Sequence, residues 1–286
     1  MIRKSTIALL RLPFSFLLLP VYLFALSQVH HIHLRNAIGV FLILHFLIYP
    51  ASNGYNSYMD QDLGSIGLLE HPPQPSKQLF WLSVVLDLTA WICSAFINVY
   101  FLIGITLNIL ASRAYSFRGI RLKKYSVGGF LTVIFFQGAW TYWMVYVGVG
   151  WSIPTTLPWL AMLASSMLFG CFYPLTQIYQ HQQDLNDGVV SISYRLGYRG
   201  TFGLSATMFL IADGIIFEYF RWQHQPFYFL LLQLFLAPVM AYFCYWFLLV
   251  TQHPWQANYK HTMRMNLIGA ICTNGYFLTL LILNHL

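Results

Sequence analysis

Nine long apolar segments constrain the fold of this chain more than any other feature of its sequence. A helix needs about 20 apolar residues to cross the roughly 30 Å of hydrocarbon in a bilayer, because each residue adds about 1.5 Å. Candidate membrane-spanning helices lie at residues 7–27, 36–51, 79–94, 95–112, 126–147, 153–178, 199–218, 226–250 and 265–284. We therefore predict an all-α, polytopic membrane protein with nine transmembrane helices, in a single domain over residues 1–286.

The composition of the chain supports this prediction. Hydrophobic residues make up 58% of the 286 residues and charged residues only 8%, whereas a typical soluble domain is about 25% charged. So few charges cannot cover a soluble surface, which excludes a soluble enzyme, a coiled coil and a disordered chain. The formal net charge is +7, and we interpret it as a signal for membrane orientation, with no nucleic-acid partner.

The basic residues predict an orientation. The third and fourth segments adjoin near Ser94 without a charged break. If they are separate helices and the N-terminus is cytoplasmic, all 15 basic residues except Arg35 and Arg221 fall on the cytoplasmic side or at its boundary. This agrees with the positive-inside rule, whereas merging the two segments would place the basic stretch 113–124 outside. We expect a multi-pass protein of the bacterial inner membrane.

Three polar loops, 52–78, 112–125 and 180–199, then share the cytoplasmic face. Of the eight acidic residues, Asp60 and Asp62 follow the second segment, and Asp184 and Asp187 follow the sixth. Mg²⁺ binds one or two carboxylates together with substrate phosphates. Because Asp and Asn are also ordinary turn residues, an acidic cluster alone does not decide between a metal site and a loop.

A basic stretch lies between the two acidic clusters in the sequence. Residues 115–126 read YSFRGIRLKKYS and contain Arg118, Arg121, Lys123 and Lys124. Such side chains bind phosphates, although cytoplasmic loops also carry Lys and Arg for topology alone. The order acidic, basic, acidic on one face of an apolar bundle indicates a site for a lipidic diphosphate.

The first acidic cluster and the basic stretch resemble motifs of the UbiA superfamily of intramembrane prenyltransferases. In NSYMDQDLG, Asn56 and Asp60 match the Asn and the middle Asp of a motif of the form NDxxDxxxD. The basic stretch is similar to YSxPPxRLK through its matching residues Tyr115, Ser116, Arg121, Leu122 and Lys123. The segment LLRLPF, around Arg11 and Pro13, is similar to the start of the family's first helix.

The second acidic cluster resembles the other motif of the same family, DxxxD followed by Gly and by Leu-Gly. Its matching residues are Gln180, Asp184, Gly188, Leu196 and Gly197. This chain departs from both motifs, because Ser57, Gly64 and Gln180 stand where the family usually has Asp. The departures leave the number of bound metal ions open.

The resemblance implies a UbiA-like bundle that transfers a prenyl group from an isoprenyl diphosphate donor to an aromatic or other lipid-soluble acceptor among the membrane lipids, with Mg²⁺ as cofactor. The implied catalytic residues are Asn56, Asp60 and Asp184. The implied metal ligands are Asn56, Asp60, Asp184 and Asp187. The implied diphosphate-binding residues are Tyr115, Arg118, Arg121, Lys123 and Gln180.

Two alternative functions remain open from the sequence. The depleted acidic motifs are compatible with a terpene cyclase of the same superfamily, which would act on a prenyl diphosphate without an acceptor. They are also compatible with a lipid-binding or transport protein that has no catalytic activity. Whether the protein is a prenyltransferase or a terpene cyclase, three tyrosines beside the motifs are candidates to stabilise an allylic cation: Tyr55, Tyr58 and Tyr179.

Overall fold

The described part of the protein is helical. A computed structural model describes residues 2–151 and 156–285, and over these ranges it contains helices and two isolated β-bridges but no strand. The α-helices are α1 (Lys4–Leu9), α2 (Ser15–Ser27), α3 (Leu34–Leu42), α4 (Tyr49–Asp60), α5 (Lys77–Ser94), α6 (Val99–Ser116), α7 (Ser126–Ile134), α8 (Thr141–Val149), α9 (Trp159–Thr176), α10 (His181–Asn186), α11 (Ile192–Trp222), α12 (Pro226–Gln252) and α13 (Tyr259–His285). Short 3₁₀ segments are η1 (Leu12–Phe14), η3 (Leu122–Lys124) and η5 (Pro254–Gln256), and π-helical segments are η2 (Ile43–Ile48) and η4 (Phe135–Trp140).

Eight helical segments of the described chain are long and apolar enough to cross a membrane. They are Lys4–Ser27, Leu34–Asp60, Val99–Ser116, Ser126–Val149, Trp159–Thr176, Ile192–Trp222, Pro226–Gln252 and Tyr259–His285. The predicted span at residues 79–94 is not among these eight segments. It corresponds to α5, which has the same length as α6, 18 residues, but includes the charged residues Lys77 and Asp87. The polytopic all-α fold is thus confirmed, and so is the separation of the third and fourth segments, because α5 ends at Ser94 and α6 begins at Val99.

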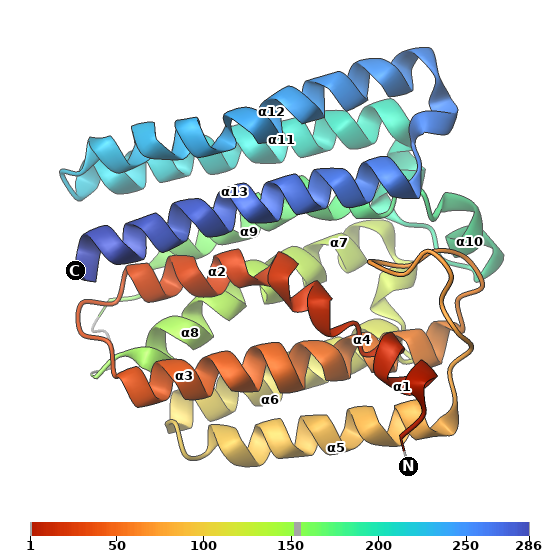
Figure 1. The fold of residues 1–286 in the computed structure, drawn as a ribbon, viewed down its shortest axis with the longest axis horizontal. Coiled ribbons are helices and arrows are strands. Elements are labelled where there is room, and N and C mark those ends of the chain that lie inside the picture. The colour runs from red at the N-terminus through yellow and green to blue at the C-terminus, as the bar shows by residue number, and fades with distance from the viewer. Residues whose placement is uncertain (1, 152–155, 286) are drawn as a thin grey trace.

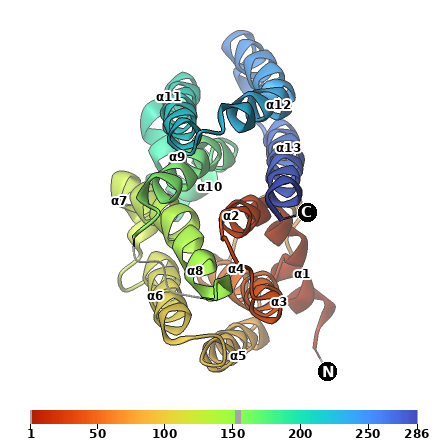
Figure 2. The ribbon, with the colours of Figure 1, turned by 90° about the vertical axis from the view of Figure 1, so that its left-hand side faces the viewer.

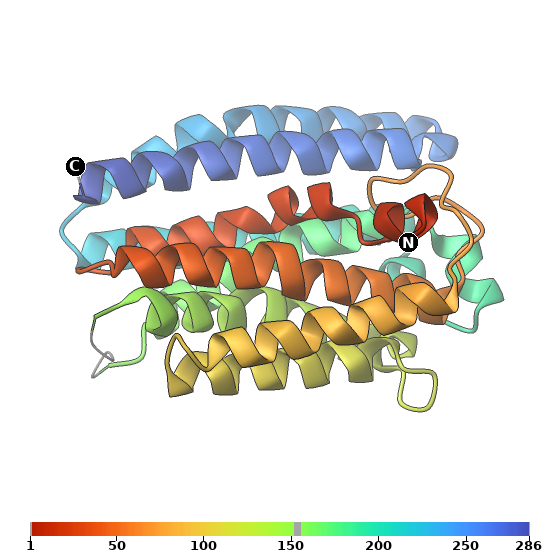
Figure 3. The ribbon, with the colours of Figure 1, turned by 60° about the horizontal axis from the view of Figure 1, so that its bottom comes forward.

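The long helices run roughly side by side along the bundle (Figure 1). Viewed toward the helix ends, α11, α12 and α13 form one side and α5 and α6 the other, with α2 and α9 between them (Figure 2). The α4–α5 loop, the α6–α7 loop and α10 all lie at one end of the bundle (Figures 1 and 3). The three polar segments singled out in the sequence are therefore neighbours in space.

The first predicted span, 7–27, begins earlier than expected and is broken. Helix α1 ends at Leu9, and Arg11 adopts a left-handed conformation with φ of 48° before η1 and α2 continue. Pro13 lacks the N–H group that an uninterrupted helix would use, which favours the break. The break lies at the same end of the bundle as the polar loops (Figure 3).

The largest other differences from the predicted boundaries lie in the second and seventh segments. The second helical segment continues beyond residue 51 to Asp60, because polar side chains of the extension bond to α6: Ser52 Oγ shares a hydrogen bond of 2.8 Å with Ser112 Oγ, and Asn56 Nδ2 donates to Ser116 Oγ at 3.0 Å. The extension also packs closely on α5, where a Cβ atom on Gly54 would lie 2.7 Å from Ser83 Oγ. The seventh begins at Ile192 instead of residue 199 and kinks at Gly197, which has φ of 67°. The predicted start of the sixth span, at residue 153, lies outside the described residues.

The π-helical segment η4 results from close contact between two helices. A Cβ atom on Gly138 would lie 2.4 Å from the Cα atom of Ser166 in α9. The hydroxyl oxygen of Ser166 also accepts a hydrogen bond from the Ala139 N–H at 3.0 Å. The wider turn therefore lets the backbones touch while its N–H groups remain bonded.

We predict that Gly138→Ala destabilises the protein by about 1–3 kcal/mol, because the added methyl group meets backbone atoms that cannot rotate away. Gly203→Ala is the matched control, since a Cβ atom added to Gly203 in α11 would meet no heavy atom within 4 Å. Thermal unfolding in detergent should show a lower midpoint for Gly138→Ala than for the control. Equal midpoints would contradict the close packing of η4 on α9.

Candidate active site

Three segments bring polar side chains together at one end of the bundle. Asn56 and Asp60 lie in the last turns of α4, and Asn56 Nδ2 donates a hydrogen bond to Ser116 Oγ at the end of α6, at 3.0 Å. Helix α4 stops after Asp60 because Gln61 is left-handed, with φ of 53°, and its N–H donates to the Ser57 carbonyl at 3.0 Å. These contacts fix the end of α4, which carries the first acidic cluster, against the basic stretch 115–126. We call the segments that carry the two acidic clusters the acidic segments, and the basic stretch the basic loop.

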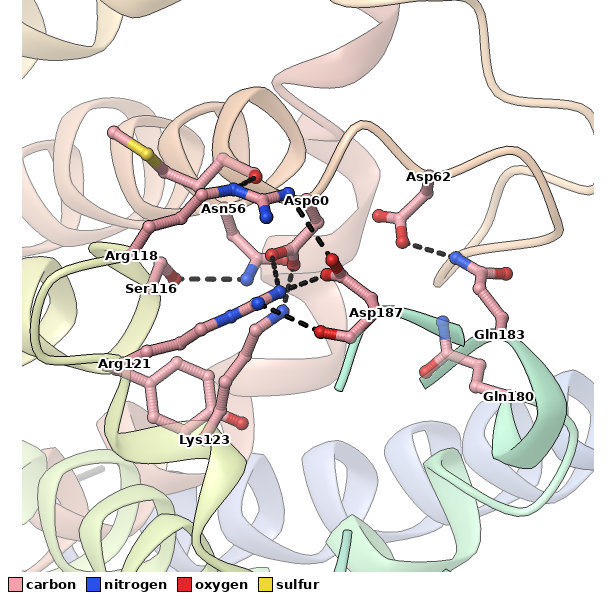
Figure 4. Close-up of polar contacts among 12 residues, drawn as sticks. Asn56, Asp60, Asp62, Ser116, Arg118, Arg121, Lys123, Gln180, Gln183 and Asp187 are labelled. Atoms are coloured by element: carbon pink, nitrogen blue, oxygen red, sulfur yellow. Dashed lines mark hydrogen bonds and ion pairs between the residues drawn. The ribbon is translucent and has the colours of Figure 1, made fainter. Parts of the chain in front are cut away.

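Ion pairs join the basic loop to both acidic segments (Figure 4). Asp60 pairs with Lys123 and, at 3.6 Å, with Arg121. Asp187 pairs with Arg121 and, at 3.4 Å, with Arg118. Arg121 therefore bridges the two acidic segments from a left-handed backbone conformation, with φ of 51°.

The arginines also bond to the backbone of the acidic segments. Arg121 Nη1 donates to the Asp187 carbonyl at 3.0 Å, and Arg118 Nε donates to the Met59 carbonyl at 2.8 Å. Left-handed backbone costs an L-residue roughly 1–2 kcal/mol. The bonds made by the Arg121 side chain offset this cost and hold the loop in place.

Two further carboxylates, those of Asp62 and Asp184, have no such compensation. In the described part of the chain neither forms an ion pair with a basic side chain. Asp62 accepts a hydrogen bond from the Gln183 amide (Figure 4). Burial, together with repulsion from Asp60, raises the pKa of Asp62 to about 6. Burial raises the pKa of Asp184 to about 7, and nearby carboxylates add to this shift while Lys123 opposes it.

Helix α10 places Asp184 through a neutral histidine. His181 Nε2 hydrogen-bonds to Ser193 Oγ at 2.7 Å, and the ring stacks on Tyr198 of α11 at 5.2 Å between centroids. Burial lowers the pKa of His181 to about 4, so the ring is uncharged at pH 7. The backbone carbonyl of Asp184 accepts from the Val189 N–H at 2.8 Å, which closes the turn that follows α10.

A polar cavity of about 240 Å³ opens among these residues. Of the nine predicted site residues, six line it: Asn56, Asp60, Tyr115, Lys123, Gln180 and Asp184. The other three, Arg118, Arg121 and Asp187, are not among its lining residues and lie in the ion-pair network beside it. Arg118 is half exposed, with 52% of its side chain accessible, whereas only 10% of the Arg121 side chain is accessible.

A second cavity, also of about 240 Å³, continues from the first into the apolar part of the bundle. Its walls come mainly from α2, α9 and α13 and include Leu17, Phe24, Phe169 and Phe277. The two cavities share part of their lining, which includes Ser52, Asn53, Gln137, Tyr173, Thr176 and Asn266. A charged compartment thus opens directly into an apolar one.

Arg11 and Tyr173 are lining residues that were not among the predicted site residues. Arg11 lines the polar cavity at the break in the first span, and its Nη2 donates to the Asn53 carbonyl at 3.4 Å. The sequence resemblance included Arg11 through the segment LLRLPF but gave it no role in the site. Tyr173 lines both cavities and shares a hydrogen bond of 2.5 Å with the hydroxyl of Tyr115. Nothing in the sequence pattern indicated this pairing, because it joins two distant helices.

The three candidate tyrosines differ in position. Tyr179 lines the polar cavity. Tyr55 lies under the guanidinium of Arg113, 3.8 Å from its ring centroid, and Tyr58 packs against Phe80 at 5.3 Å between centroids. Neither Tyr55 nor Tyr58 is among the residues that line either cavity.

The cavity offers the oxygen ligands that Mg²⁺ prefers. Asp60, Asp62 and Asp184 supply carboxylates, and Asn56 supplies an amide. Within residues 2–151 and 156–285, no three His, Cys, Asp or Glu side chains form a group that could hold a metal ion by themselves. This donor set fits an ion that completes its coordination with water and substrate phosphate, as Mg²⁺ commonly does.

The fold and the joined cavities define a polytopic membrane protein with a charged site that opens into an apolar pocket. The family model for the UbiA prenyltransferase family matches residues 15–268, which is most of the chain. The chain therefore belongs to the UbiA prenyltransferase family, and the resemblance recognised in its motifs is confirmed.

Solved structures share this fold. A UbiA homolog from Archaeoglobus fulgidus bound to GPP and Mg²⁺ is 16% identical, with a TM-score of 0.70 over 98% of this chain and 100% of that chain. An apo UbiA homolog from Aeropyrum pernix K1 is 18% identical, with a TM-score of 0.69 over 98% and 99%. A structure concerned with digeranylgeranylglyceryl phosphate synthase in membranes is 18% identical, with a TM-score of 0.63 over 98% and 97%. No curated protein sequence matches the chain significantly.

We predict that ionisation of Asp184 destabilises the metal-free protein, because the carboxylate has no ion-pair partner among the described residues. A raised native pKa means that the folded state holds this proton while the unfolded chain has already released it, so the contribution of Asp184 to stability falls from a pH of about 4 and levels off above a pH of about 7. Asp184→Asn removes the charge and should raise the midpoint of thermal unfolding at pH 8 by about 2–4 °C.

The measurement is intrinsic fluorescence on heating, in detergent with EDTA. Asp213→Asn is the matched control, since Asp213 lies in α11 and accepts a hydrogen bond from Gln233 at 2.6 Å, away from the cavity. A lower midpoint for Asp184→Asn than for wild type at pH 8 would mean that the carboxylate stabilises the fold.

Proposed function

We propose that this protein transfers a prenyl group from an isoprenyl diphosphate to an aromatic or other lipid-soluble acceptor, and that the reaction requires Mg²⁺. One observation carries the proposal: a polar cavity with carboxylates and Lys123 continues directly into an apolar cavity of similar volume. An isoprenyl diphosphate has the same division into a charged head and an apolar tail.

The polar cavity suits the diphosphate head. Lys123 and Arg11 line it and supply positive charge. Arg121 does not line the cavity but holds the basic loop in place through its ion pair with Asp187. Asn56, Asp60 and Asp184 would hold Mg²⁺, with Asp62 beside them, and Gln180 and Tyr115 would help to orient the phosphates. Mg²⁺, when bound, neutralises the negative charge that builds up on a departing diphosphate. Asp187 is ion-paired to arginines outside the cavity, so its part in metal binding would require that network to open.

The apolar cavity suits the prenyl tail and excludes water from the reacting carbon. In the transfer, the bond between C1 of the prenyl group and the diphosphate oxygen breaks, and its electron pair leaves with the diphosphate. A new bond forms between C1 and the acceptor, whose displaced proton passes to a diphosphate oxygen or a cavity carboxylate. The structures of a UbiA homolog from Archaeoglobus fulgidus bound to GPP and Mg²⁺, and to DMAPP and Mg²⁺, support a prenyl diphosphate as donor and Mg²⁺ as cofactor.

The cellular setting is part of the proposal. The distribution of basic residues supports a cytoplasmic site and N-terminus, and we place the protein in the bacterial inner membrane. The donor would then enter from the same aqueous compartment as the polar loops, and the acceptor would enter from the lipid.

We predict Mg²⁺-dependent release of pyrophosphate when purified protein receives geranyl, farnesyl or geranylgeranyl diphosphate with a mixture of lipid-soluble acceptors. Asp60→Ala and Asp184→Ala should each reduce the rate by about 100-fold or more, because each removes a carboxylate that would hold the Mg²⁺ needed to stabilise the leaving diphosphate. Asp213→Asn, far from the cavity, should retain the wild-type rate.

The same assay separates the alternatives. Release without an acceptor, with a hydrocarbon or terpene alcohol as product, would replace the transferase with a terpene cyclase. Tight binding of a prenyl diphosphate without release, from folded protein and with every acceptor, would indicate a lipid-binding protein. Activity that is unchanged in both aspartate variants would contradict the proposed site.

A further inference from the structure

Two buried amide groups at the junction of the cavities have no partner. Gln137 and Asn266 line both the polar and the apolar cavity. Among the described residues nothing forms a hydrogen bond with Gln137 Oε1 or Asn266 Nδ2, although both atoms are buried. Asn266 as a whole is only 7% exposed. A buried polar atom without a hydrogen bond is destabilising, so both atoms would gain from a ligand that supplies one.

The backbone at Gln137 departs from regular α-helical geometry. It lies in the π-helical segment η4, and its neighbour Gly138 anchors that segment directly on the backbone of Ser166. π-helical turns occur often at functional sites because they redirect side chains from the regular helical positions. The anchored turn therefore holds the Gln137 side chain at the junction.

Asn266 begins a lining face on α13. Residues 266, 269, 270 and 273 follow helical spacing, and all four line the apolar cavity. The face is otherwise small or satisfied: Gly269 makes room for the ring of Phe172, and Thr273 Oγ1 donates to the Gly269 carbonyl at 2.7 Å. Asn266 is the member of this face that also borders the polar cavity and that keeps a free donor.

The two free atoms are complementary in type. Gln137 Oε1 accepts a hydrogen bond, and Asn266 Nδ2 donates one. A diphosphate offers acceptors without donors, and a prenyl tail offers neither. A hydroxyl group offers both, since it can accept from Asn266 and donate to Gln137.

We propose that Gln137 and Asn266 bind the hydroxyl group of the acceptor, which makes the acceptor a lipid-soluble alcohol or phenol. This inference rests on the proposed transferase function. The junction is where the head and the tail of a prenyl diphosphate would meet, so a hydroxyl held there lies beside the carbon that reacts.

The test is equilibrium binding of matched pairs of probes to the intact protein in lipid nanodiscs. The pairs are 1-naphthol with 1-methoxynaphthalene, and 1-dodecanol with its methyl ether. Calorimetry is performed with Mg²⁺, both with and without geranyl S-thiolodiphosphate, a donor analogue that resists reaction. Wild-type protein should bind at least one alcohol about tenfold or more tightly than its ether, because the ether cannot donate to Gln137.

Gln137→Leu should bring the ratio of alcohol to ether affinity close to one, because it removes the acceptor that only the alcohol can use. Asn266→Leu should instead weaken the binding of both the alcohol and the ether, since both probes can accept from Asn266 Nδ2. Asn274→Leu is the control: Asn274 lies on the same helix and is also buried, but it lines neither cavity and donates to the Phe16 carbonyl at 3.1 Å. It should keep the wild-type ratio.

Three results would overturn the proposal: a wild-type ratio near one, no binding of either alcohol, or an unchanged ratio in Gln137→Leu together with unchanged affinities in Asn266→Leu. The first would mean that ordinary water satisfies the two atoms. The wild-type ratio decides the matter even if a variant fails to fold. If the protein does not bind the thiolodiphosphate, the proposed transferase function is contradicted. The ratio of alcohol to ether affinity measured without the analogue would still test the hydroxyl site.

Discussion

Carboxylates buried at one end of an apolar helix bundle are the constraint on which the rest of the site depends. Each ion removed from water costs several kcal/mol unless it is compensated. Lys123, Arg118 and Arg121 compensate Asp60 and Asp187, and this network locks the basic loop onto α4 and the turn after α10. Asp62 and Asp184, beside the same cavity, form no ion pair with any described residue, so the folded protein has a place prepared for positive charge.

The helical framework makes this arrangement possible by departing from regular geometry. The break at Arg11 brings a guanidinium to the cavity, and the π-helical segment η4 anchors one wall on α9. Left-handed residues end α4 and hold the basic loop. Of these irregular segments, the break places Arg11 in the lining of the charged cavity, and η4 places Gln137 where the charged and apolar cavities share their lining.

Much of the fold and part of the site could be predicted from the sequence, because hydropathy and charge are local properties. The apolar segments, the split near Ser94 and the convergence of three polar loops all follow from them. The extent of α4 could not be predicted, since its polar side chains find hydrogen-bond partners on α6, which is distant in the sequence. The role of Asn266 could not be predicted from the sequence either, because it depends on which cavity its helix faces. The motifs grouped Asp187 with the metal ligands, and only coordinates reveal its pairing with two arginines.

The central claim is that this cavity binds Mg²⁺ and a prenyl diphosphate together. Calorimetric titration of wild-type protein with geranyl S-thiolodiphosphate, across a series of Mg²⁺ concentrations, tests it most directly. The account predicts that Mg²⁺ raises the affinity for the analogue by about tenfold or more, and that the analogue raises the affinity for Mg²⁺ by the same factor. Equal affinity for the analogue in Mg²⁺ and in EDTA would contradict it.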